Sequence, residues 1–134
     1  MSTHPGALSD LRVVEMGVLL AGPYAGQLFA DHGAEVIKLE PPGQGDPMRD
    51  WGQEKPHGQS LWWPVVARNK KSVTVNLRTA EGQDLVRRLA AVSDVLIANL
   101  RPGTLETLLF FTNHRVVGVE NLSAGDLARL AAGG

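Results

Sequence analysis

The sequence predicts an α/β fold, in which an open and mostly parallel sheet carries helices on both faces. Short apolar segments alternate with segments of helical periodicity along most of the 134 residues. The first strand, helix and strand together are short enough to form one βαβ unit. Residues 95–98 are wholly apolar, which is typical of a strand in a parallel sheet covered on both faces. One modest domain accommodates a chain of this length.

The first three elements define the predicted βαβ unit. Residues 12–16 are rich in β-branched side chains and predict a strand, and residues 35–39 predict a second strand. Between them, small and apolar residues recur at helical spacing over residues 24–32. Pro23 suits the first turn of this helix and Gly33 suits its end. The unit favours a Rossmann-like sheet, which binds ligands beyond the carboxyl ends of its strands.

The middle of the chain combines a long loop with a second strand and helix pair. Residues 41–60 are rich in proline, glycine and charge, so we expect an irregular surface loop, followed by a short helix over residues 60–67. Residues 72–77 alternate between polar and apolar side chains and predict a third strand. A helix follows, with Thr79 as its N-cap. The buried stripe of that helix is predicted to consist of Leu85, Val86, Leu89 and Val92.

The last part of the chain shows a weaker pattern. The apolar fourth strand ends in an abrupt Asn-Leu-Arg-Pro-Gly loop over residues 99–103. Residues 115–120 predict a fifth strand. Residues 123–130 predict a short helix that is opened by a capping pair, Ser123 and Asp126.

Composition excludes several classes of protein. Hydrophobic residues make up 43% of the sequence and charged residues 20%, so a packed core is expected. The formal net charge of −1 argues against a nucleic-acid partner bound by a basic face. The absence of cysteine excludes disulfides, thiolate nucleophiles and cysteine-based zinc sites. No apolar run is long enough to cross a bilayer, and residues 1–10 lack an apolar signal core. We therefore expect no membrane partner and a cytoplasmic location.

Two features lie at strand ends, where an open α/β sheet binds its ligands. The glycine-containing loop and helix start over residues 17–26 follow the first strand, but their spacing is not G-x-G-x-x-G. Glu40 ends the second strand, near the position where a dinucleotide-binding fold places its ribose-binding acid. Taken alone, this spacing favours a plain turn and helix start over a ligand site.

The charged residues allow more than one interpretation. The Arg-Asn-Lys-Lys-Ser stretch over residues 68–72 is either a solvated basic loop or a group of cations that neutralises a phosphate. The loop over residues 99–103 is either a structural turn or part of a ligand edge. The four histidines lack ligand-like spacing, so no metal site is expected. We expect most of the scattered carboxylates to be solvated, namely those of Asp31, Glu35, Glu40, Asp46 and Glu54.

Taken together and in order, several motifs resemble one family. The first motifs are Leu8-x-x-Leu-Arg-Val-Val-Glu-Met, Ala21-Gly-Pro and Asp31-His-Gly-Ala-Glu-Val-Ile-Lys-Leu-Glu-Pro. The match continues through Gly45-Asp46 with Arg49, Arg68-Asn-Lys-Lys-Ser-Val, Thr79-x-Glu-Gly, Asp94-Val-Leu-Ile-x-Asn and Arg101-Pro-Gly. Over residues 8–106 the sequence resembles family III CoA-transferases, which include formyl-CoA and carnitine-CoA transferases and the α-methylacyl-CoA racemases.

The resemblance implies a domain plan and a chemistry. Residues 1–7 are expected to be a flexible N-terminus, residues 8–106 a Rossmann-like CoA-binding domain, and residues 107–134 a divergent C-terminal segment. The transferases move CoA between carboxylic acids through mixed anhydrides with an enzyme aspartate, whereas the racemases use acid and base groups. No residue of this sequence matches the motif of that aspartate, so no catalytic residue is assigned. We expect a fold that is truncated relative to the interlocked dimer of the family, and a chain that is inactive alone.

Coenzyme A, bound as a substrate and without a metal, is the ligand that the resemblance implies. By position, the implied CoA-binding residues are Leu20, Ala21, Val75, Asn76, Leu77, Arg78, Asn99, Leu100 and Arg101. Among them, Arg78 occupies the position of a basic residue of the family, and we expect it to contact phosphate. The sequence departs from the family at Pro41 and Thr107, where many relatives carry basic residues. These departures weaken the expected contacts with CoA.

The sequence leaves three hypotheses open. The first is a truncated CoA-transferase, or a fragment of the racemase type. The second is a non-catalytic CoA-binding module or a subunit of a split enzyme; its partners would be CoA or acyl-CoA and either a second copy in a homodimer or a complementary chain that carries the missing half. The third is a dinucleotide-binding Rossmann domain or a structural remnant without a ligand, although the absence of G-x-G-x-x-G argues against NAD.

Overall fold

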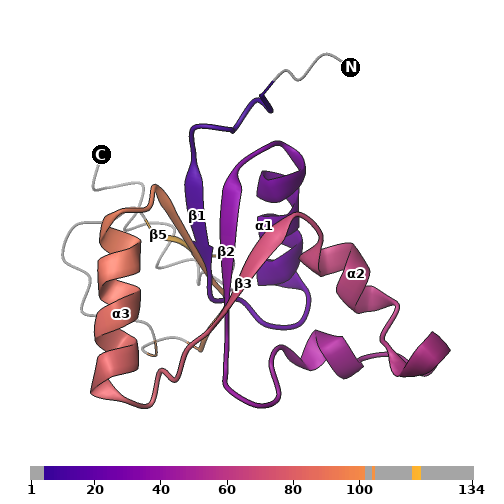
Figure 1. Ribbon diagram of the computed structural model, residues 1–134. Coiled ribbons are helices and arrows are strands. Elements are labelled where there is room, and N and C mark those ends of the chain that lie inside the picture. The colour runs from indigo at the N-terminus through magenta and orange to yellow at the C-terminus, as the bar shows by residue number, and fades with distance from the viewer. Residues whose placement is uncertain (1–4, 102–103, 105–115, 119–134) are drawn as a thin grey trace, which may run out of the picture.

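The computed structural model describes residues 5–101, 104 and 116–118, and one sheet forms its centre (Figure 1). The strand order is β3-β2-β1-β4-β5, and each neighbouring pair is parallel. This order places the first strand in the middle of the sheet, as in Rossmann-like folds. The strands are β1 (Arg12–Glu15), β2 (Glu35–Glu40), β3 (Lys70–Thr74), β4 (Val95–Ala98) and β5 (Val116–Gly118).

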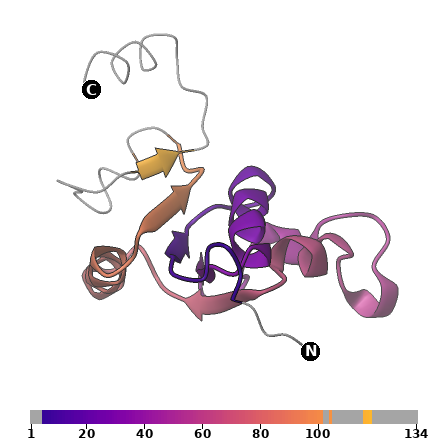
Figure 2. The same cartoon turned by 90° about the horizontal axis from the view of Figure 1, so that it is seen from above.

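Helices cover both faces of the sheet, as the sequence predicts. Figure 2 shows α1 (Ala21–Asp31) and α2 (Trp62–Ala67) on one face and α3 (Ala80–Ala91) on the other. Two 3-10 turns, η1 (Pro47–Asp50) and η2 (Pro56–Gly58), lie in the long loop that connects β2 to α2. The predicted α/β architecture is therefore confirmed.

The hydrophobic core consists of two clusters, one on each face of the sheet. Val14 of β1 belongs to the cluster that includes Val86 of α3. Its neighbour Val13 belongs to the cluster that includes Ala30 of α1. Successive side chains of a strand point to opposite faces, so both residues of β1 are fully buried. This double burial explains why the central strands are apolar along their length.

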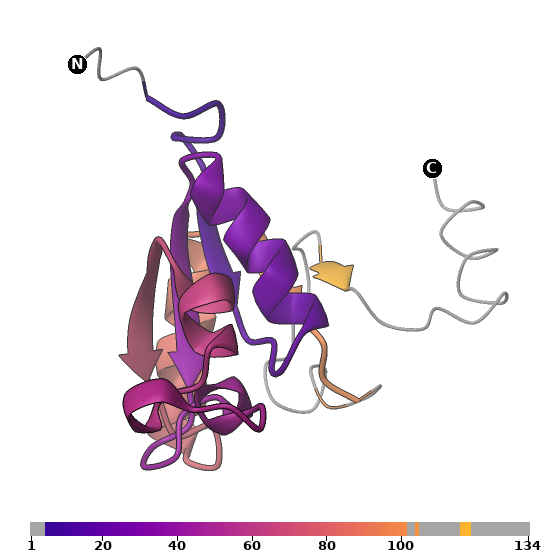
Figure 3. The same ribbon diagram turned by 90° about the vertical axis from the view of Figure 1, so that its right-hand side faces the viewer.

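The loops after β1, β2, β3 and β4 converge at one edge of the sheet, because parallel strands end on the same side. The register aligns Val14 with Ile37 and with Leu96, and it aligns Lys38 with Ser72. Figure 3 shows β2 and β3 ending at the edge where η1 lies. This carboxyl edge positions the candidate site described below.

The third strand starts earlier than the alternation predicts. β3 comprises Lys70–Thr74, whereas residues 72–77 were expected, and Lys70 pairs with Val36 at the edge of the sheet. Val75 still donates its backbone N–H to the carbonyl of Glu40 (2.9 Å), and the chain then turns toward α3. β3 lies at the edge of the sheet, where side chains are less buried than in a central strand. The charged residues Lys70 and Lys71 can therefore begin this strand.

The α3 helix agrees with its predicted cap but not with its whole predicted stripe. Thr79 accepts a hydrogen bond from the backbone N–H three residues later (3.1 Å), which confirms it as the N-cap. Val86 is fully buried and Leu89 packs against the core. Leu85 and Val92 are instead 43% and 63% exposed, so that part of the prediction is wrong. Of the four apolar residues predicted to face the sheet, only Val86 and Leu89 pack against the core.

Two predictions concern the C-terminal part of the chain. The predicted strand over residues 115–120 corresponds to β5, whereas the predicted helix over residues 123–130 lies outside the described residues. Within the described part of the chain, no helix combines the length and the hydrophobicity that crossing a bilayer requires.

Candidate functional site

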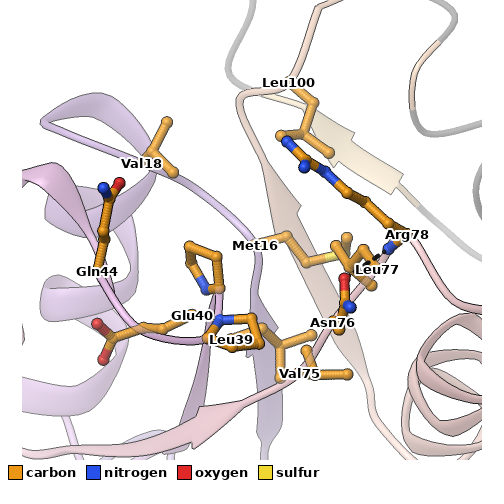
Figure 4. Close-up of a pocket in the computed structure, with 12 residues that line it drawn as sticks. Met16, Val18, Leu39, Glu40, Gln44, Val75, Asn76, Leu77, Arg78 and Leu100 are labelled. Carbon is orange, nitrogen blue, oxygen red and sulfur yellow. Dashed lines mark hydrogen bonds between the residues drawn. The ribbon is translucent and has the colours of Figure 1, made fainter.

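A cleft of about 520 Å³ opens at the carboxyl edge of the sheet (Figure 4). Its walls come from the segments that follow β1, β2, β3 and β4, as expected for a ligand site of an open α/β sheet. In Figure 4, Val18 and Gln44 lie on one side, and Arg78 extends toward Leu100 on the other. The lining consists of Met16, Val18, residues 39–42, Gln44, residues 75–78 and Leu100.

The cleft brings together five of the nine residues that the resemblance assigns to ligand binding. Four of them, residues 75–78, follow β3, and the fifth is Leu100. Leu20 and Ala21 do not line the cleft; both are exposed where α1 begins. Asn99 is half-buried beneath the first loop, and Arg101 is exposed beyond Leu100.

Sequence reasoning missed the lining residues that follow β1 and β2. Met16 and Val18 form part of the wall after β1, while Leu39 near the end of β2 and Gln44 beyond it form another part. The rule that parallel sheets bind ligands at their carboxyl ends applies to these positions too, and it would have identified them. The family motifs drew attention to Leu20 instead, which lies two residues after Val18.

The first loop, residues 17–20, is held by three side chains from other parts of the chain. The carboxamide of Asn99 accepts a hydrogen bond from the Val18 N–H (2.8 Å) and donates one to the Val18 carbonyl (2.9 Å). Lys38 donates to the carbonyl of Gly17 (2.9 Å), and the Leu19 N–H donates to Asp46 (3.3 Å). These bonds fix the wall that Val18 contributes to the cleft. α1 begins at Ala21, directly after this loop and before the predicted start at residue 24.

A buried cluster of four charges lies behind this loop. Lys38 contacts carboxylate oxygens of Glu15 (2.8 Å) and Asp46 (2.7 Å), and all three side chains are at most 1% exposed. Lys70 from β3 binds the second oxygen of Glu15. Burial lowers the pKa of Lys70, although the charge of Glu15 opposes this shift. The expectation that Asp46 is solvated is therefore wrong.

The charge cluster also sets the position of α1. An added Cβ atom at Gly26 would lie 2.1 Å from the Glu15 carboxylate and 3.2 Å from the Lys70 ammonium. Real side chains do not approach atoms this closely. Only glycine at this position allows the helix to pack directly over the ion pair.

Glu40 is fully engaged by the protein itself. Its two oxygens accept bonds from Arg49 (2.7 and 2.8 Å), from the Ser72 hydroxyl (2.6 Å) and from the Asp46 N–H (2.9 Å). Burial alone would raise the pKa of Glu40, but the bonds from Arg49, Ser72 and Asp46 outweigh it and hold the pKa at about 2. The carboxylate points away from the cleft (Figure 4). It is buried rather than solvated, and a ribose hydroxyl finds no free acceptor here, which weighs against the dinucleotide hypothesis.

The basic stretch of residues 68–71, at the amino end of β3, is neutralised by carboxylates of the same chain. Arg68 binds Asp31, and Lys71 binds Glu35. The bonds from Arg68 and then Gln27 hold the pKa of Asp31 at about 2, and those from Lys71 and Arg12 hold the pKa of Glu35 at about 2. With Lys70 in the buried cluster, none of the three cations faces the cleft. The segment is largely exposed, as the solvated alternative expects, although part of it forms β3 and its cations are paired with carboxylates.

Arg78 is the cation that lines the cleft. Its side chain is exposed, and within the described residues no carboxylate forms an ion pair with it. Val18, Val75, Leu77 and Leu100 supply apolar walls nearby. The arrangement therefore accommodates an elongated ligand that has an apolar arm and an anionic group. The described residues contain no group of three His, Asp or Glu side chains that could hold a metal ion.

Comparisons with known proteins identify the relatives of this chain. A model of CoA-transferase family III matches residues 8–114. A succinyl-CoA–D-citramalate CoA-transferase from Chloroflexus aurantiacus is 63% identical over 102 residues, which cover 76% of this chain and 25% of the relative. The alpha subunit of a succinyl-CoA–L-malate CoA-transferase from the same organism is 51% identical over 100 residues, which cover 74% and 23%. The chain thus spans about a quarter of the length of the curated relatives it matches.

A solved structure agrees with the sequence comparisons. A CAIB/BAIF family protein from Brucella suis superposes with a TM-score of 0.71 and is 41% identical; the match covers 78% of this chain and 29% of that protein.

Proposed function

The chain belongs to CoA-transferase family III, and on that premise we propose that residues 8–106 form the CoA-binding domain of an enzyme that transfers CoA between carboxylic acids. The observation that supports this proposal is the cleft at the carboxyl edge, with apolar walls and Arg78 at one side. CoA combines phosphate groups with a long pantetheine arm, whose methyl and methylene groups alternate with two amides. Both parts match the chemistry of the lining.

Each part of the ligand has a proposed partner. The pantetheine arm lies along Val18, Leu77 and Leu100, while the guanidinium of Arg78 binds a phosphate. At the rim, the proposed site also includes Leu20, Ala21, Asn99 and Arg101, from the loops after β1 and β4. Val75 and Asn76 complete the wall after β3.

The proposed reaction passes through a covalent intermediate. An aspartate carboxylate attacks the acyl-CoA carbonyl, the carbon–sulfur bond breaks, and CoA leaves as a thiolate while an acyl–aspartyl anhydride remains. The thiolate then attacks the aspartyl carbonyl of the anhydride, which releases the donor acid and leaves an aspartyl-CoA thioester. The acceptor carboxylate attacks this thioester and displaces the thiolate again, and attack of the thiolate on the acceptor carbonyl of the new anhydride gives the acceptor's CoA thioester and frees the aspartate. We assign that aspartate to no residue of this sequence, so the 134-residue chain is expected to bind CoA without turnover.

The proposed protein partners are a second copy of this chain and a complementary chain. One relative of this chain is an alpha subunit. We propose that the domain works in an assembly, either with a complementary chain that supplies the catalytic aspartate or as a homodimer that binds CoA without turnover, and that its ligands in the cytoplasm are CoA and acyl-CoA.

Calorimetric titration of the chain with CoA and with NAD tests the proposal. We expect CoA to bind and NAD to give no measurable heat. Arg78→Gln should weaken CoA binding about tenfold or more, since a charge-assisted bond to phosphate contributes about 1.5–3 kcal/mol. Arg88→Gln is the matched control, because it removes the same charge from the exposed side of α3 and should leave the affinity unchanged.

Two outcomes would contradict the proposal. One is the absence of binding at millimolar CoA. The other is an equal loss of affinity in both arginine variants, which would indicate a general charge effect instead of a site at Arg78.

A further inference from the structure

Two loops meet behind the candidate site: the first loop and the loop over residues 41–46, which follows β2. The ammonium of Lys38 donates to the Gly17 carbonyl (2.9 Å) and lies 2.7 Å from one carboxylate oxygen of Asp46. The other oxygen of Asp46 accepts a hydrogen bond from the Leu19 N–H (3.3 Å). We call these three contacts the loop tie, because they connect the two loops through one ion pair.

The loop tie acts on two residues of the cleft wall. Gly17 and Leu19 flank Val18, so the two bonds to the first loop hold Val18 from either side. Gln44 lies two residues before Asp46. Val18 and Gln44 both line the cleft, and Figure 4 shows them on the same side of it. A change in the loop tie is therefore expected to move both wall residues.

The first loop depends on such support, because Leu19 is strained. Its φ of 60° lies in the left-handed region, which an L-residue with a branched side chain rarely adopts. Surrounding bonds must maintain such a conformation. Asn99 supplies two bonds to Val18, but Asn99 belongs to the proposed CoA site, so a substitution there would alter the ligand contact and the loop together. Lys38 and Asp46 allow the loop to be altered separately.

The side chains of Lys38 and Asp46 are shielded both from solvent and from the cleft. Each is at most 1% exposed, and neither lines the cleft. Because water does not reach the ion pair, it cannot replace a partner that a substitution removes. The two side chains can therefore influence a ligand in the cleft only through the loops that they hold.

We propose that Lys38 and Asp46 are positioning residues for the CoA cleft. Their ion pair joins the loop after β2 to the first loop, and it thereby keeps Val18 and Gln44 in the arrangement that binds CoA. This inference deepens the proposed function and depends on it for the identity of the ligand. The contacts that make up the loop tie do not depend on it.

The test uses Asp46→Ser, Lys38→Met and the double variant. Serine keeps the N-cap of η1, where Asp46 accepts from the Met48 N–H (2.8 Å), but it lacks the carboxylate that contacts Lys38. Each single variant leaves an excess buried charge, whereas the double variant leaves Glu15 paired with Lys70. In urea denaturation, the midpoint of the double variant should therefore lie above that of Lys38→Met.

Hydrogen exchange and CoA titration report on the first loop and on the ligand. Without ligand, the Leu19 amide should exchange about tenfold faster or more in all three variants, because the first loop opens more often. All three variants should bind CoA at least about threefold more weakly than the wild type. Asp50→Ser is the matched control: it makes the same substitution at a carboxylate that is 85% exposed, and it should change neither measurement.

The double variant separates positioning from stability. Its stability recovers relative to Lys38→Met, yet the loop tie is absent, so the Leu19 exchange rate and the affinity for CoA should not recover. If both single variants fail to fold, Asp46→Asn provides a milder change: it keeps the acceptor oxygen for the Leu19 N–H and loses the charge that faces Lys38. Compared with Asp50→Asn, it should raise the Leu19 exchange rate and weaken CoA binding.

Two results would overturn the inference. One is an Asp46→Ser variant that loses stability but keeps the Leu19 exchange rate and the CoA affinity of the wild type, since the ion pair would then be purely structural. The other is a double variant in which CoA affinity recovers together with stability. If the wild-type chain fails to bind CoA, the proposed function fails, while the Leu19 exchange rates still decide whether the loop tie exists.

Discussion

The two ends of β3 carry basic residues that differ in what neutralises them. At the amino end, Arg68, Lys70 and Lys71 each bind a carboxylate of the same chain. Beyond the carboxyl end, Arg78 lines the cleft and has no carboxylate partner among the described residues. The amino end holds more positive charge, yet the carboxyl end is the one that faces a ligand cavity. Strand direction, and not charge density, therefore identifies the candidate phosphate contact.

The largest expected effect concerns the buried cation of the amino end. Lys70→Met leaves the Glu15 carboxylate with one of its two cations in a site closed to water. Breaking a buried ion pair in this way typically costs about 3–5 kcal/mol, which is a large part of the stability of a small domain. Urea denaturation measures the loss. Lys71→Met, whose side chain is 69% exposed, is the control on the same strand, and equal losses would refute the distinction.

The exposed pairs of the amino end predict a loss of stability in acid. The pKa values of Asp31 and Glu35 lie at about 2 in the folded chain, below the ordinary values of 3.8 and 4.5. The stability contributed by these carboxylates is complete above the ordinary values, and it falls as the pH drops toward about 2. We expect the combined Arg68→Gln and Lys71→Gln variant to show a shallower decline of the unfolding free energy between pH 4.5 and 2. Arg78→Gln should retain the wild-type decline; a change of similar size there would reveal a carboxylate partner of Arg78.

The salt dependence of CoA affinity should reveal the contribution of Arg78, beyond the carboxyl end of β3. Raising NaCl from about 0.05 M to about 0.5 M screens an exposed guanidinium–phosphate contact. CoA binding to the wild-type chain should therefore weaken severalfold over this range, whereas Arg78→Gln should show a smaller change. Titration calorimetry at several salt concentrations measures both slopes, and parallel slopes would exclude Arg78 as the phosphate contact.

The smallest effect is expected for Arg68. Because Arg68 is bound to Asp31 and does not line the cleft, Arg68→Gln should leave the affinity for CoA unchanged within about twofold. A loss that matches that of Arg78→Gln would show that the amino end of β3 also contributes to ligand binding.

The sequence predicted the layers of the fold better than the bounds of its edge elements. Periodicity identified the central strands because burial on both faces demands apolar residues there, as at Val13 and Val14. β3 is an edge strand, and its first residues, Lys70 and Lys71, carry no apolar pattern. The pairing with β2 that makes them a strand depends on the tertiary structure, which local propensity does not encode.

The candidate site was predicted only in part, because some of its contacts also depend on the tertiary structure. The residues after β3 and β4 were identified because family motifs cover them, and the cleft does contain residues 75–78 and Leu100. The burial of Glu15, at the end of β1, and of Asp46, in the loop before η1, could not be predicted, because a carboxylate in either place is normally solvated unless a cation from another element reaches it. Lys38 and Lys70 reach it only once three strands are assembled.

The contact between Gly26 and the Glu15–Lys70 pair links two choices that a protein engineer would otherwise make separately. An all-hydrocarbon redesign of the buried charges would remove the oxygen that lies 2.1 Å from the Cβ position. Position 26 would accept alanine, the best helix former, only if the new side chains were also shorter, because the Glu15 Cδ atom (2.9 Å) and the Lys70 Nζ atom (3.2 Å) crowd the same Cβ position. Glycine in a helix interior costs about 1 kcal/mol relative to alanine. Neither substitution is expected to succeed alone, so the two should be screened as a pair in any library built on this scaffold.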